Sequence, residues 1–292
     1  MDAVLPLVSV LMTAYNRDKY IAEAIESVLN SSYSNFELII VDDCSTDKTF
    51  AIASSYLGKN KRIQVFKNEY NLGQFANRNK AIEISNGEYI KFLDSDDKIM
   101  PNGLEVMVKS MLAFPDAGIG IPAKSTNKNK LPIQIMPHES VWMHYTTENH
   151  LCYGPTGSIF KKKSLEEAGL FEDNYGILAD TLLNIKMASL SPTVFFAPDL
   201  FYWRRHDEQV TEAQNDDVRM IGERDIILKA AMAYTQLPLN QLERKQILKN
   251  FIKINTRHFL HYFLKGKFEK AFQIKRETEL SFTKVLSVLF KK

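Results

Sequence analysis

Three carboxylates stand within four positions of the chain, Asp94, Asp96 and Asp97, directly after the apolar run GEYIKFL. Like charges this close repel, and burying them is costly unless a cation or a set of hydrogen-bond donors compensates. Hard divalent cations such as Mg²⁺ take oxygen ligands, commonly one or two carboxylates together with substrate phosphates. The cluster therefore suits a metal ion that carries a phosphate-bearing substrate. The alternative is a solvated acidic turn, since Asp and Ser favour turns.

The segments around this cluster alternate between strand and helix patterns. Runs rich in Val, Ile and Leu suit strands that are buried on both faces of a parallel sheet. Between them, apolar residues recur at helical spacing, as in Ile21, Ile25 and Val28. The alternation predicts a doubly wound, mostly parallel α/β sheet. The expected strands are 7–13, 36–43, 62–68 and 88–94, and the expected helices are 17–32, 45–58, 73–87 and 101–114.

Polar residues follow three of the predicted strands, at 13–16, 42–43 and 94–97. Ligands of doubly wound sheets bind beyond the carboxyl ends of the strands. Acidic residues scattered at random over a surface would not gather at one edge of a sheet. The aspartates are therefore expected to line a ligand site.

The composition is that of an ordinary globular protein, with 45% apolar and 25% charged residues in a chain of 292. This length suits one large α/β domain with an extension. Two cysteines, Cys44 and Cys152, give no disulfide framework, which fits a reducing cytosol. The first residues lack the basic start of a signal peptide, and no apolar stretch reaches the roughly 18 residues of a membrane span. We therefore expect a cytoplasmic protein.

After residue 115 the pattern loosens. The polar, proline-bearing stretch 124–140 is interpreted as a long loop, and loops of that length are usually functional or mobile. Short strands are expected at 157–161 and 193–198, with helices near 163–169 and 179–190. Beyond 213 the chain looks helical to its end.

Three linked segments carry a more specific signal than the aspartates alone. They are PLVSVLMTAYNRDKYIAEAIESVL, FELIIVDDCSTDKT and NLGQFANRNKAIEISNGEYIKFLDSDDKIMP. In order and spacing they resemble the nucleotide-sugar-binding half of the family 2 glycosyltransferases, which have the GT-A fold. The resemblance implies a GT-A domain at 1–212, composed of a nucleotide-sugar-binding half at 1–120 and an acceptor half at 121–212. A basic helical extension at 213–292 would follow.

The resemblance implies roles for residues at the ends of the first two strands. Thr13, Ala14 and Tyr15 would line the base pocket, with Tyr15 near the uracil ring, and Asp43 would accept a hydrogen bond from the base. Arg78 would lie near the phosphates. Each has a simpler alternative: Tyr15 could cap the sheet, Asp43 could be the N-cap of the next helix, and Arg78 could be a solvated or salt-bridged residue.

The aspartate cluster receives its roles from the same resemblance. Asp94, with Ser95, would face the ribose or the sugar, and Asp96 would bind the metal. Asp97 would support the site or replace Asp96 as a ligand. The implied cofactor is a divalent cation, Mn²⁺ or Mg²⁺.

The acceptor half offers a candidate catalytic base in the stretch YGILADTLLNIKMASL. Family members commonly carry a Glu-Asp pair at such a helix start, with the Asp as base. Here the pair is Ala179-Asp180, so the Glu is missing and Asp180 is the choice. The alternative is a helix N-cap at Asp180. Glu172 and Asp173 are the fallback candidates for the base.

The stretch YWRRHDEQVT resembles an Arg-Xaa-His segment of the family. This implies that His206 is a further metal ligand or a diphosphate contact, although a lone histidine is usually an ordinary surface or core residue. Arg204 and Arg205 could neutralise phosphate charge.

Together these expectations describe an inverting glycosyltransferase. It would move a sugar to a hydroxyl of a glycan or lipid-linked acceptor in cell-surface polysaccharide synthesis, and the expected donor is a UDP-sugar. One alternative is a degenerate protein that binds the nucleotide-sugar without turnover. The other is a nucleotidyltransferase, which would need a Gly- and Arg-rich loop after the first strand, where this chain has TAYNRDKY.

The end of the chain is basic. Residues 243–292 carry 13 Lys and Arg against four Glu, while the whole chain has a net charge of only +2. Helical spacing places Phe259, Tyr262, Phe263 and Leu264 on one side. Such a stretch suits either a peripheral contact with the inner face of the cell membrane or a helical bundle packed on the catalytic domain. Nucleic-acid binding is not expected, because no recognition motif accompanies the charge.

Overall fold

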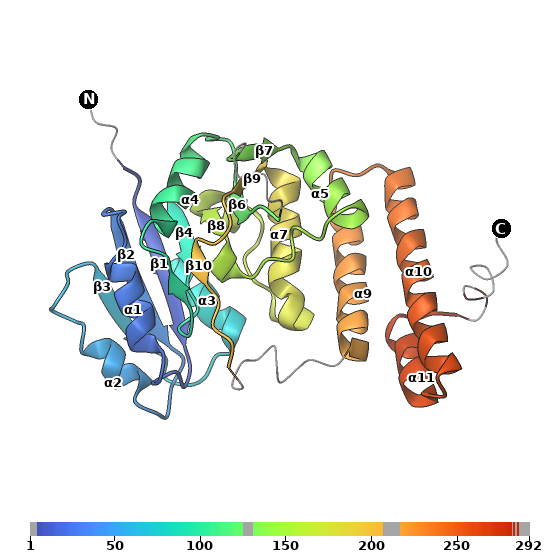
Figure 1. The fold of residues 1–292 in the computed structure, drawn as a ribbon, viewed down its shortest axis with the longest axis horizontal. Coiled ribbons are helices and arrows are strands. Elements are labelled where there is room, and N and C mark those ends of the chain that lie inside the picture. Colours follow the sequence, from blue (N-terminus) through green and yellow to red (C-terminus); the bar gives the residue numbers. More distant parts are fainter. Residues whose placement is uncertain (1–4, 125–130, 207–216, 282, 284, 286–292) are drawn as a thin grey trace.

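A computed structural model describes residues 5–124, 131–206, 217–281, 283 and 285 of the chain. In this part of the chain the main sheet has eight strands in the order β3-β2-β1-β4-β8-β6-β9-β7 (Figure 1). Strands β1 to β4 are mutually parallel, and β6 is parallel to β9, whereas β8 and β7 run antiparallel to their neighbours. The sheet is therefore mostly parallel, as predicted. The strands are β1 Val8–Ala14, β2 Phe36–Asp42, β3 Ile63–Lys67, β4 Tyr89–Phe92, β6 Ile119–Pro122, β7 Ile133–Ile135, β8 Ile159–Lys161 and β9 Thr193–Phe196.

The central strands are apolar on both faces because helices cover both sides of the sheet. In β1, Val10 and Met12 belong to one buried cluster and Leu11 to the other, as the period of two along a strand requires. The first cluster includes residues of α1 and α4, and the second includes residues of α3 and α7. The helices of the sheet region are α1 Ile21–Leu29, α2 Thr49–Ser54, α3 Gln74–Glu83, α4 Gly103–Leu112, α5 Pro137–Thr146, α6 Lys162–Glu167 and α7 Ala179–Leu190, with 3-10 turns η2 Pro155–Gly157 and η3 Asp173–Leu178.

The stretch 124–140 is not one long loop, so that prediction was wrong in part. Residues 125–130 lie outside the described residues, but Ile133–Ile135 forms β7 and pairs with β9, and α5 begins at Pro137. A three-residue edge strand leaves too short a pattern to recognise. Proline at the first turn of α5 supplied a helix start that resembles a loop signal.

A short antiparallel ribbon matters more for the site than its size suggests. It pairs β5 (Lys98–Ile99) with β10 (Phe201–Tyr202). The ribbon brings the segment that follows β10 beside the aspartates that precede β5. Residues far apart in the sequence thereby share one end of the sheet.

The end of the chain is helical, as predicted, with α9 Asp217–Ala233, α10 Gln241–Leu264 and α11 Phe268–Glu277. Figure 1 shows these three helices beside the sheet, beyond α7 and α5. Asn240 and Glu243 form a capping box at the start of α10. Ile227 and Leu228 of α9 join the same buried cluster as Leu182 of α7, so α9 packs on the sheet region. The division of the chain at 212 and 213 stays a prediction.

Two further properties concern the cysteines and the helices. Cys44 and Cys152 are both free thiols. Within the described ranges, no helix combines the length and the apolar character that crossing a bilayer would require.

Candidate functional site

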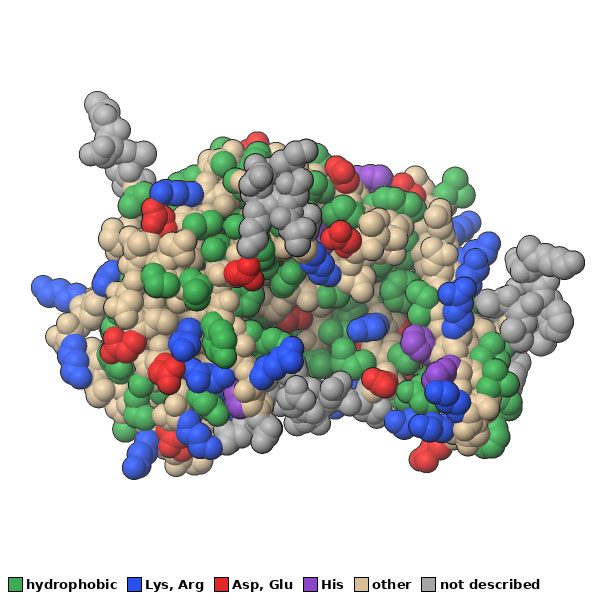
Figure 2. All heavy atoms as spheres, viewed as in Figure 1, with side chains coloured by type: hydrophobic (Ala, Val, Ile, Leu, Met, Phe, Trp, Pro, Cys, Tyr) green, Lys and Arg blue, Asp and Glu red, His purple; other side chains and the backbone are tan. Residues whose placement is uncertain are grey.

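A cleft of about 1230 Å³ lies beyond the carboxyl ends of β1, β2 and β4. This exceeds the roughly 300–1,000 Å³ of common ligand pockets, so it has room for a nucleotide-sugar and part of an acceptor. Figure 2 shows the face hollowed between the sheet region and the C-terminal helices. All but one of the predicted site residues line this cleft: Thr13, Ala14, Tyr15, Asp43, Arg78, Asp94, Ser95, Asp96 and Asp180. The exception is His206, whose side chain contacts Asp96, one of the lining residues.

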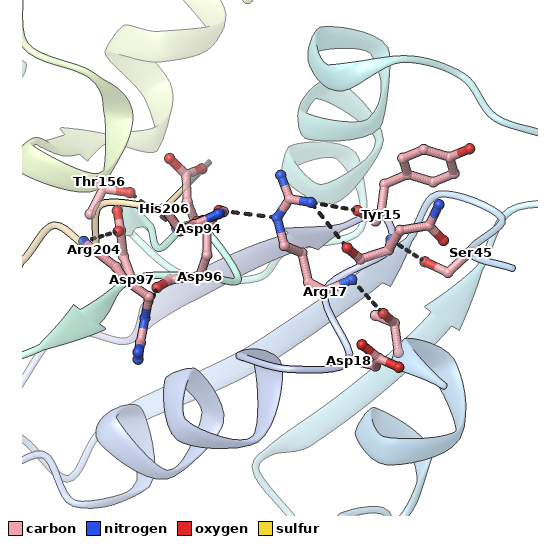
Figure 3. Close-up of polar contacts among 12 residues, drawn as sticks. Tyr15, Arg17, Asp18, Ser45, Asp94, Asp96, Asp97, Thr156, Arg204 and His206 are labelled. Carbon is pink, nitrogen blue, oxygen red and sulfur yellow. Dashed lines mark hydrogen bonds and ion pairs between the residues drawn. The ribbon is translucent and has the colours of Figure 1, made fainter. Parts of the chain in front are cut away.

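Asp96 lies between two basic side chains (Figure 3). Its Oδ2 accepts from Arg17 Nε at 3.0 Å and lies 3.0 Å from His206 Nε2. Arg17 comes from the turn between β1 and α1, and its guanidinium also donates to the backbone oxygens of Tyr15 and Asn16. His206 lies in the segment that follows β10. The structure thus brings together the two residues that sequence reasoning had named as metal ligands.

The imidazole of His206 is well fixed. It is 9% exposed, and its ring centroid lies 4.6 Å from that of Tyr20. Its second nitrogen, Nδ1, is buried and has no hydrogen-bond partner among the described residues. His206 is therefore not an ordinary surface histidine.

The neighbouring arginines hold this segment in place. The Arg204 side chain donates to the Asp96 backbone oxygen at 2.9 Å and to Glu23 at 2.8 Å, and its backbone N–H donates to Asp97 Oδ1 at 3.0 Å. The guanidinium of Arg205 lies 5.3 Å from the ring of Trp203. Arg204 thus fastens the end of the ribbon to the aspartate turn.

Asp94 is paired with Arg78. Arg78 Nη2 donates to Asp94 Oδ1 at 2.8 Å, and the Arg78 side chain is only 4% exposed. Its guanidinium also lies within 6 Å of the rings of Phe75 and Phe171. The guanidinium of Arg78 is buried and always charged, and it lines the cleft beside one carboxylate, that of Asp94. Such a group is suited to binding anionic ligands. The salt-bridged alternative for Arg78 is therefore correct, and it places the arginine in the site.

Asp43 organises the loop before α3. Its Oδ1 accepts from Asn68 at 2.7 Å and from Leu72 N at 2.9 Å, and its Oδ2 accepts from Gly73 N at 3.0 Å. Gly73 has a φ of 87°, a conformation that favours glycine. Asp43 is thus not the N-cap of α2, which begins after Lys48. Its Oδ2 accepts one of these bonds and retains capacity for another donor.

Asp180 lines the cleft from the second position of α7. Its Oδ1 accepts from the backbone N–H of Thr181 at 2.7 Å, and it is not the N-cap, which is Leu178. Burial raises the pKa of Asp180 to about 6, although the charge of Arg78 acts in the opposite direction. The fallback Glu172 is paired with Lys186, and neither it nor Asp173 lines the cleft. Asp180 is therefore the better placed of the three.

Lys91 lies beneath the aspartate turn and is fully buried in β4. Its ammonium donates to the backbone oxygens of Thr156 and of Ser158, the latter at 3.2 Å. Thr156 in turn accepts from the backbone N–H of Asp94 at 3.0 Å. Burial lowers the pKa of Lys91 to about 7, against the attraction of Asp94 and Asp97. Burial also raises the pKa of Asp97 to about 7, helped by the charge of Asp94.

Sequence reasoning missed Arg17, Lys91 and Thr156 as parts of the site. A lysine inside the apolar run YIKFL was a usable signal, because a charge is rarely buried without a specific partner. Arg17 stands directly after a predicted strand end and could have been found in the same way. Thr156 gave no signal, since its contact depends on a strand far away in sequence.

Comparison with known proteins identifies the family of the chain. Residues 9–169 match the family described as Glycosyl transferase family 2. A Bacillus subtilis protein described as "Putative teichuronic acid biosynthesis glycosyltransferase TuaG" is 43% identical over 123 residues, which are 41% of this chain and 49% of TuaG. The chain spans about half or less of the length of the curated relatives it matches.

Two solved structures share the fold. S. aureus TarS 1–349 in complex with UDP-GlcNAc aligns with a TM-score of 0.70 and 21% identity, covering 92% of this chain and 79% of that one. The mannosyltransferase PcManGT from Pyrobaculum calidifontis, in complex with GDP-Man and Mn²⁺, aligns with a TM-score of 0.65 and 18% identity, covering 98% and 79%. On the family match and this sheet, the chain belongs to glycosyl transferase family 2 and has the GT-A fold.

Proposed function

We propose that the protein is an inverting glycosyltransferase that moves a sugar from a nucleotide-sugar to an acceptor hydroxyl. The observation that carries this proposal is that carboxylates with different surroundings line one cleft. On one side, Asp94 and Asp96 are held by basic side chains, and on the other Asp180 faces the same space with a raised pKa. Family membership favours this reading over a nucleotidyltransferase.

The donor would lie along the carboxyl ends of β1, β2 and β4. Thr13, Ala14 and Tyr15 would contact the base, and the free capacity of Asp43 would accept its N–H. Arg78 would face the diphosphate, and Asp94 with Ser95 the ribose or sugar. UDP is our choice of nucleotide, and a hexose is our choice of sugar. TarS was solved with UDP-GlcNAc and PcManGT with GDP-Man, so GDP is the competing donor.

The residues present fit a divalent cation. Asp96 and His206 converge on one point, and their oxygen and nitrogen donors suit Mn²⁺ or Mg²⁺. No group of three or more His, Cys, Asp or Glu side chains forms a metal site within the described part of the chain. Diphosphate oxygens and water would therefore have to complete the shell, as is common for Mg²⁺. A cation held there would supply Lewis-acid stabilisation of the leaving nucleoside diphosphate.

Asp180 would act as the catalytic base. It would take the proton of the acceptor hydroxyl as that oxygen attacks the anomeric carbon from the face opposite the diphosphate. A single displacement inverts the configuration and needs no covalent intermediate. A base with a pKa of about 6 is deprotonated at neutral pH and close enough to it to accept a proton efficiently.

The acceptor is proposed to be a glycan or a lipid-linked saccharide of the cell surface. The relative TuaG is named for teichuronic acid biosynthesis, which supports a polysaccharide pathway. Free cysteines and a basic C-terminal region support a cytoplasmic protein that works at the inner face of the membrane.

A protein that binds donor without turnover is the second candidate. The specific observation in its favour is Ala179, which stands where the resemblance leads us to expect a glutamate. Transfer or hydrolysis of a sugar by the purified chain would exclude this candidate.

The testing experiment is a thermal-shift panel with UDP, dTDP, GDP and CDP, each with and without Mn²⁺, on the wild type and on Asp96→Ala. We expect a metal-dependent rise in Tm with one nucleotide, lost in the variant. Glu88→Ala, a change at the opposite end of β4, serves as a control that retains the shift. Shifts with no nucleotide, or shifts indifferent to metal and to Asp96, would contradict the proposed site.

A further inference from the structure

The turn between α10 and α11 carries a cluster of exposed apolar side chains. Phe263, Leu264, Phe268 and Phe272 are 39%, 81%, 51% and 47% exposed. The ring of Phe263 lies 5.1 Å from that of Phe268 and 6.3 Å from that of Phe272, so the three rings are contiguous. We call these four residues the hairpin patch. Contiguous exposed apolar surface on a folded protein usually marks a binding surface.

The hairpin patch is not part of the protein's own core. The inner face of the same helices is buried through Phe259, Ala271 and Ile274, which pack with Val218 of α9. Phe259, which had been predicted to share a face with Phe263, is only 3% exposed and supports the patch from below through ring stacking at 5.6 Å. The helices therefore satisfy their packing with one face and leave the other apolar face outside.

Lysines surround the hairpin patch. Lys265 and Lys267 lie in the turn, and Lys270 lies on the first turn of α11, and all three are exposed. The nearest acid in sequence is Glu269. Lys and Arg side chains also gather over this end of the molecule in Figure 2. Such a surface matches one leaflet of an anionic bilayer: the apolar rings can enter the acyl-chain region, and the lysines can contact the negative headgroups.

The position of the hairpin patch relates it to the cleft. In Figure 1 the turn between α10 and α11 lies on the same side of the molecule as the carboxyl ends of β1 and β2, where the cleft is. Helix α9, which packs on α11, also contributes Met220 to the cleft lining. A flat surface against the hairpin patch would therefore pass near the acceptor side of the cleft.

The geometry points to a docking surface for an anionic lipid bilayer, made by Phe263, Leu264, Phe268 and Phe272 with Lys265, Lys267 and Lys270. Docking there holds the cleft close to headgroups that carry a lipid-linked acceptor. This last consequence rests on the proposed function, whereas the docking itself does not.

The test is co-sedimentation of the full chain with phosphatidylcholine vesicles and with vesicles of phosphatidylcholine and phosphatidylglycerol. We expect binding to the anionic vesicles only, weakened by salt. Leu264→Ser/Phe268→Ser should weaken binding about tenfold or more. Lys265→Gln/Lys267→Gln should weaken it about fivefold per lysine removed. The matched control is Leu57→Ser/Lys59→Gln/Lys61→Gln, an exposed apolar and basic group after α2, which should bind like the wild type.

Three results would overturn the inference: no binding by the wild type, equal binding to both vesicle types, or variants that bind like the wild type. Self-association of the wild type that Leu264→Ser/Phe268→Ser abolishes, without vesicle binding, would assign the hairpin patch to a second copy of the chain instead. The nucleotide-induced thermal shift should be unchanged in the patch variants. Failure of docking and failure of the proposed donor site are thus read from separate measurements.

Discussion

The two sides of the cleft hold their carboxylates in opposite ways. On the proposed donor side, Asp94 faces Arg78, and Asp96 faces Arg17 and His206. On the proposed acceptor side, Asp180 instead accepts from its neighbour in the chain, through the backbone N–H of Thr181. Paired carboxylates keep a fixed geometry, whereas a carboxylate whose pKa is raised to about 6, mainly by burial, can exchange a proton near neutral pH. The difference suggests that one side is built to hold charge and the other to move a proton.

The largest effect should come from removing the proton acceptor. Asp180→Asn should lower kcat about 10²- to 10⁴-fold, the usual contribution of a general base, because the amide cannot take the proton. Nucleotide affinity, measured by calorimetry, should be largely retained, since the nucleotide is proposed to lie along the ends of β1, β2 and β4, whereas Asp180 comes from α7. Glu172→Gln is the matched control and should keep most of the activity. Retained turnover in Asp180→Asn would remove the base from its assigned position.

A smaller effect is expected on the donor side. Arg78→Gln should weaken nucleotide binding about 10- to 100-fold, because a buried charged hydrogen bond contributes about 1.5–3 kcal/mol. Arg62→Gln, an arginine at the start of β3 outside the cleft, should bind the nucleotide like the wild type. If Arg78→Gln lowered kcat and left affinity intact, the proposed division between the two sides would fail.

The pH dependence of turnover should report the acceptor side. Since burial raises the pKa of Asp180 to about 6, the base becomes protonated as the pH falls through this value. We expect kcat to fall about tenfold per pH unit below 6, and to be insensitive to this group above 7. Asp94→Asn should shift the midpoint downward, because the charge of Asp94 contributes to raising the pKa of Asp180. A midpoint that did not move would mean that the two sides are electrostatically independent.

The smallest effect is expected at Lys91, whose ammonium joins β4 to residues 156–158, and it should appear in stability. Lys91→Met leaves two buried carbonyls without a donor, so the free energy of unfolding should fall by about 1–3 kcal/mol. The loss is partly offset because a buried ammonium is itself costly. Lys161→Met is the control: its ammonium also donates to a carbonyl, that of Pro115 at 2.9 Å, but in an exposed place where water can replace it. Denaturant unfolding of both variants would measure the difference.

The sequence was a good guide to the donor half because its signals are local. Strands β1 to β4 lie within two residues of the predicted ranges, and each is a run of apolar residues between turn signals. The polar residues at the strand ends could be placed together because parallel strands end at one edge. Helix α1 begins later than expected, at Ile21, and the turn before it is what carries Arg17 to Asp96.

The acceptor half was harder because its structure depends on contacts distant in sequence. His206 meets Asp96 only because the β5–β10 ribbon pairs segments about a hundred residues apart. Strand β7 has three residues and is defined by β9 rather than by its own pattern. The raised pKa of Asp180 follows from burial, which the sequence YGILADT does not reveal.

Strand β8 has a consequence for recombination between relatives. It comes from the predicted acceptor half, yet it pairs with β4 of the predicted donor half through Tyr89 and Ile90, and on its other edge with β6. A chimera joined at residue 120 would therefore insert a foreign strand into the middle of the sheet. Donor preference should be exchangeable among relatives by grafting side chains at the strand ends, but not by swapping halves. The sheet would therefore have to be exchanged as a whole for these strand pairings to be kept.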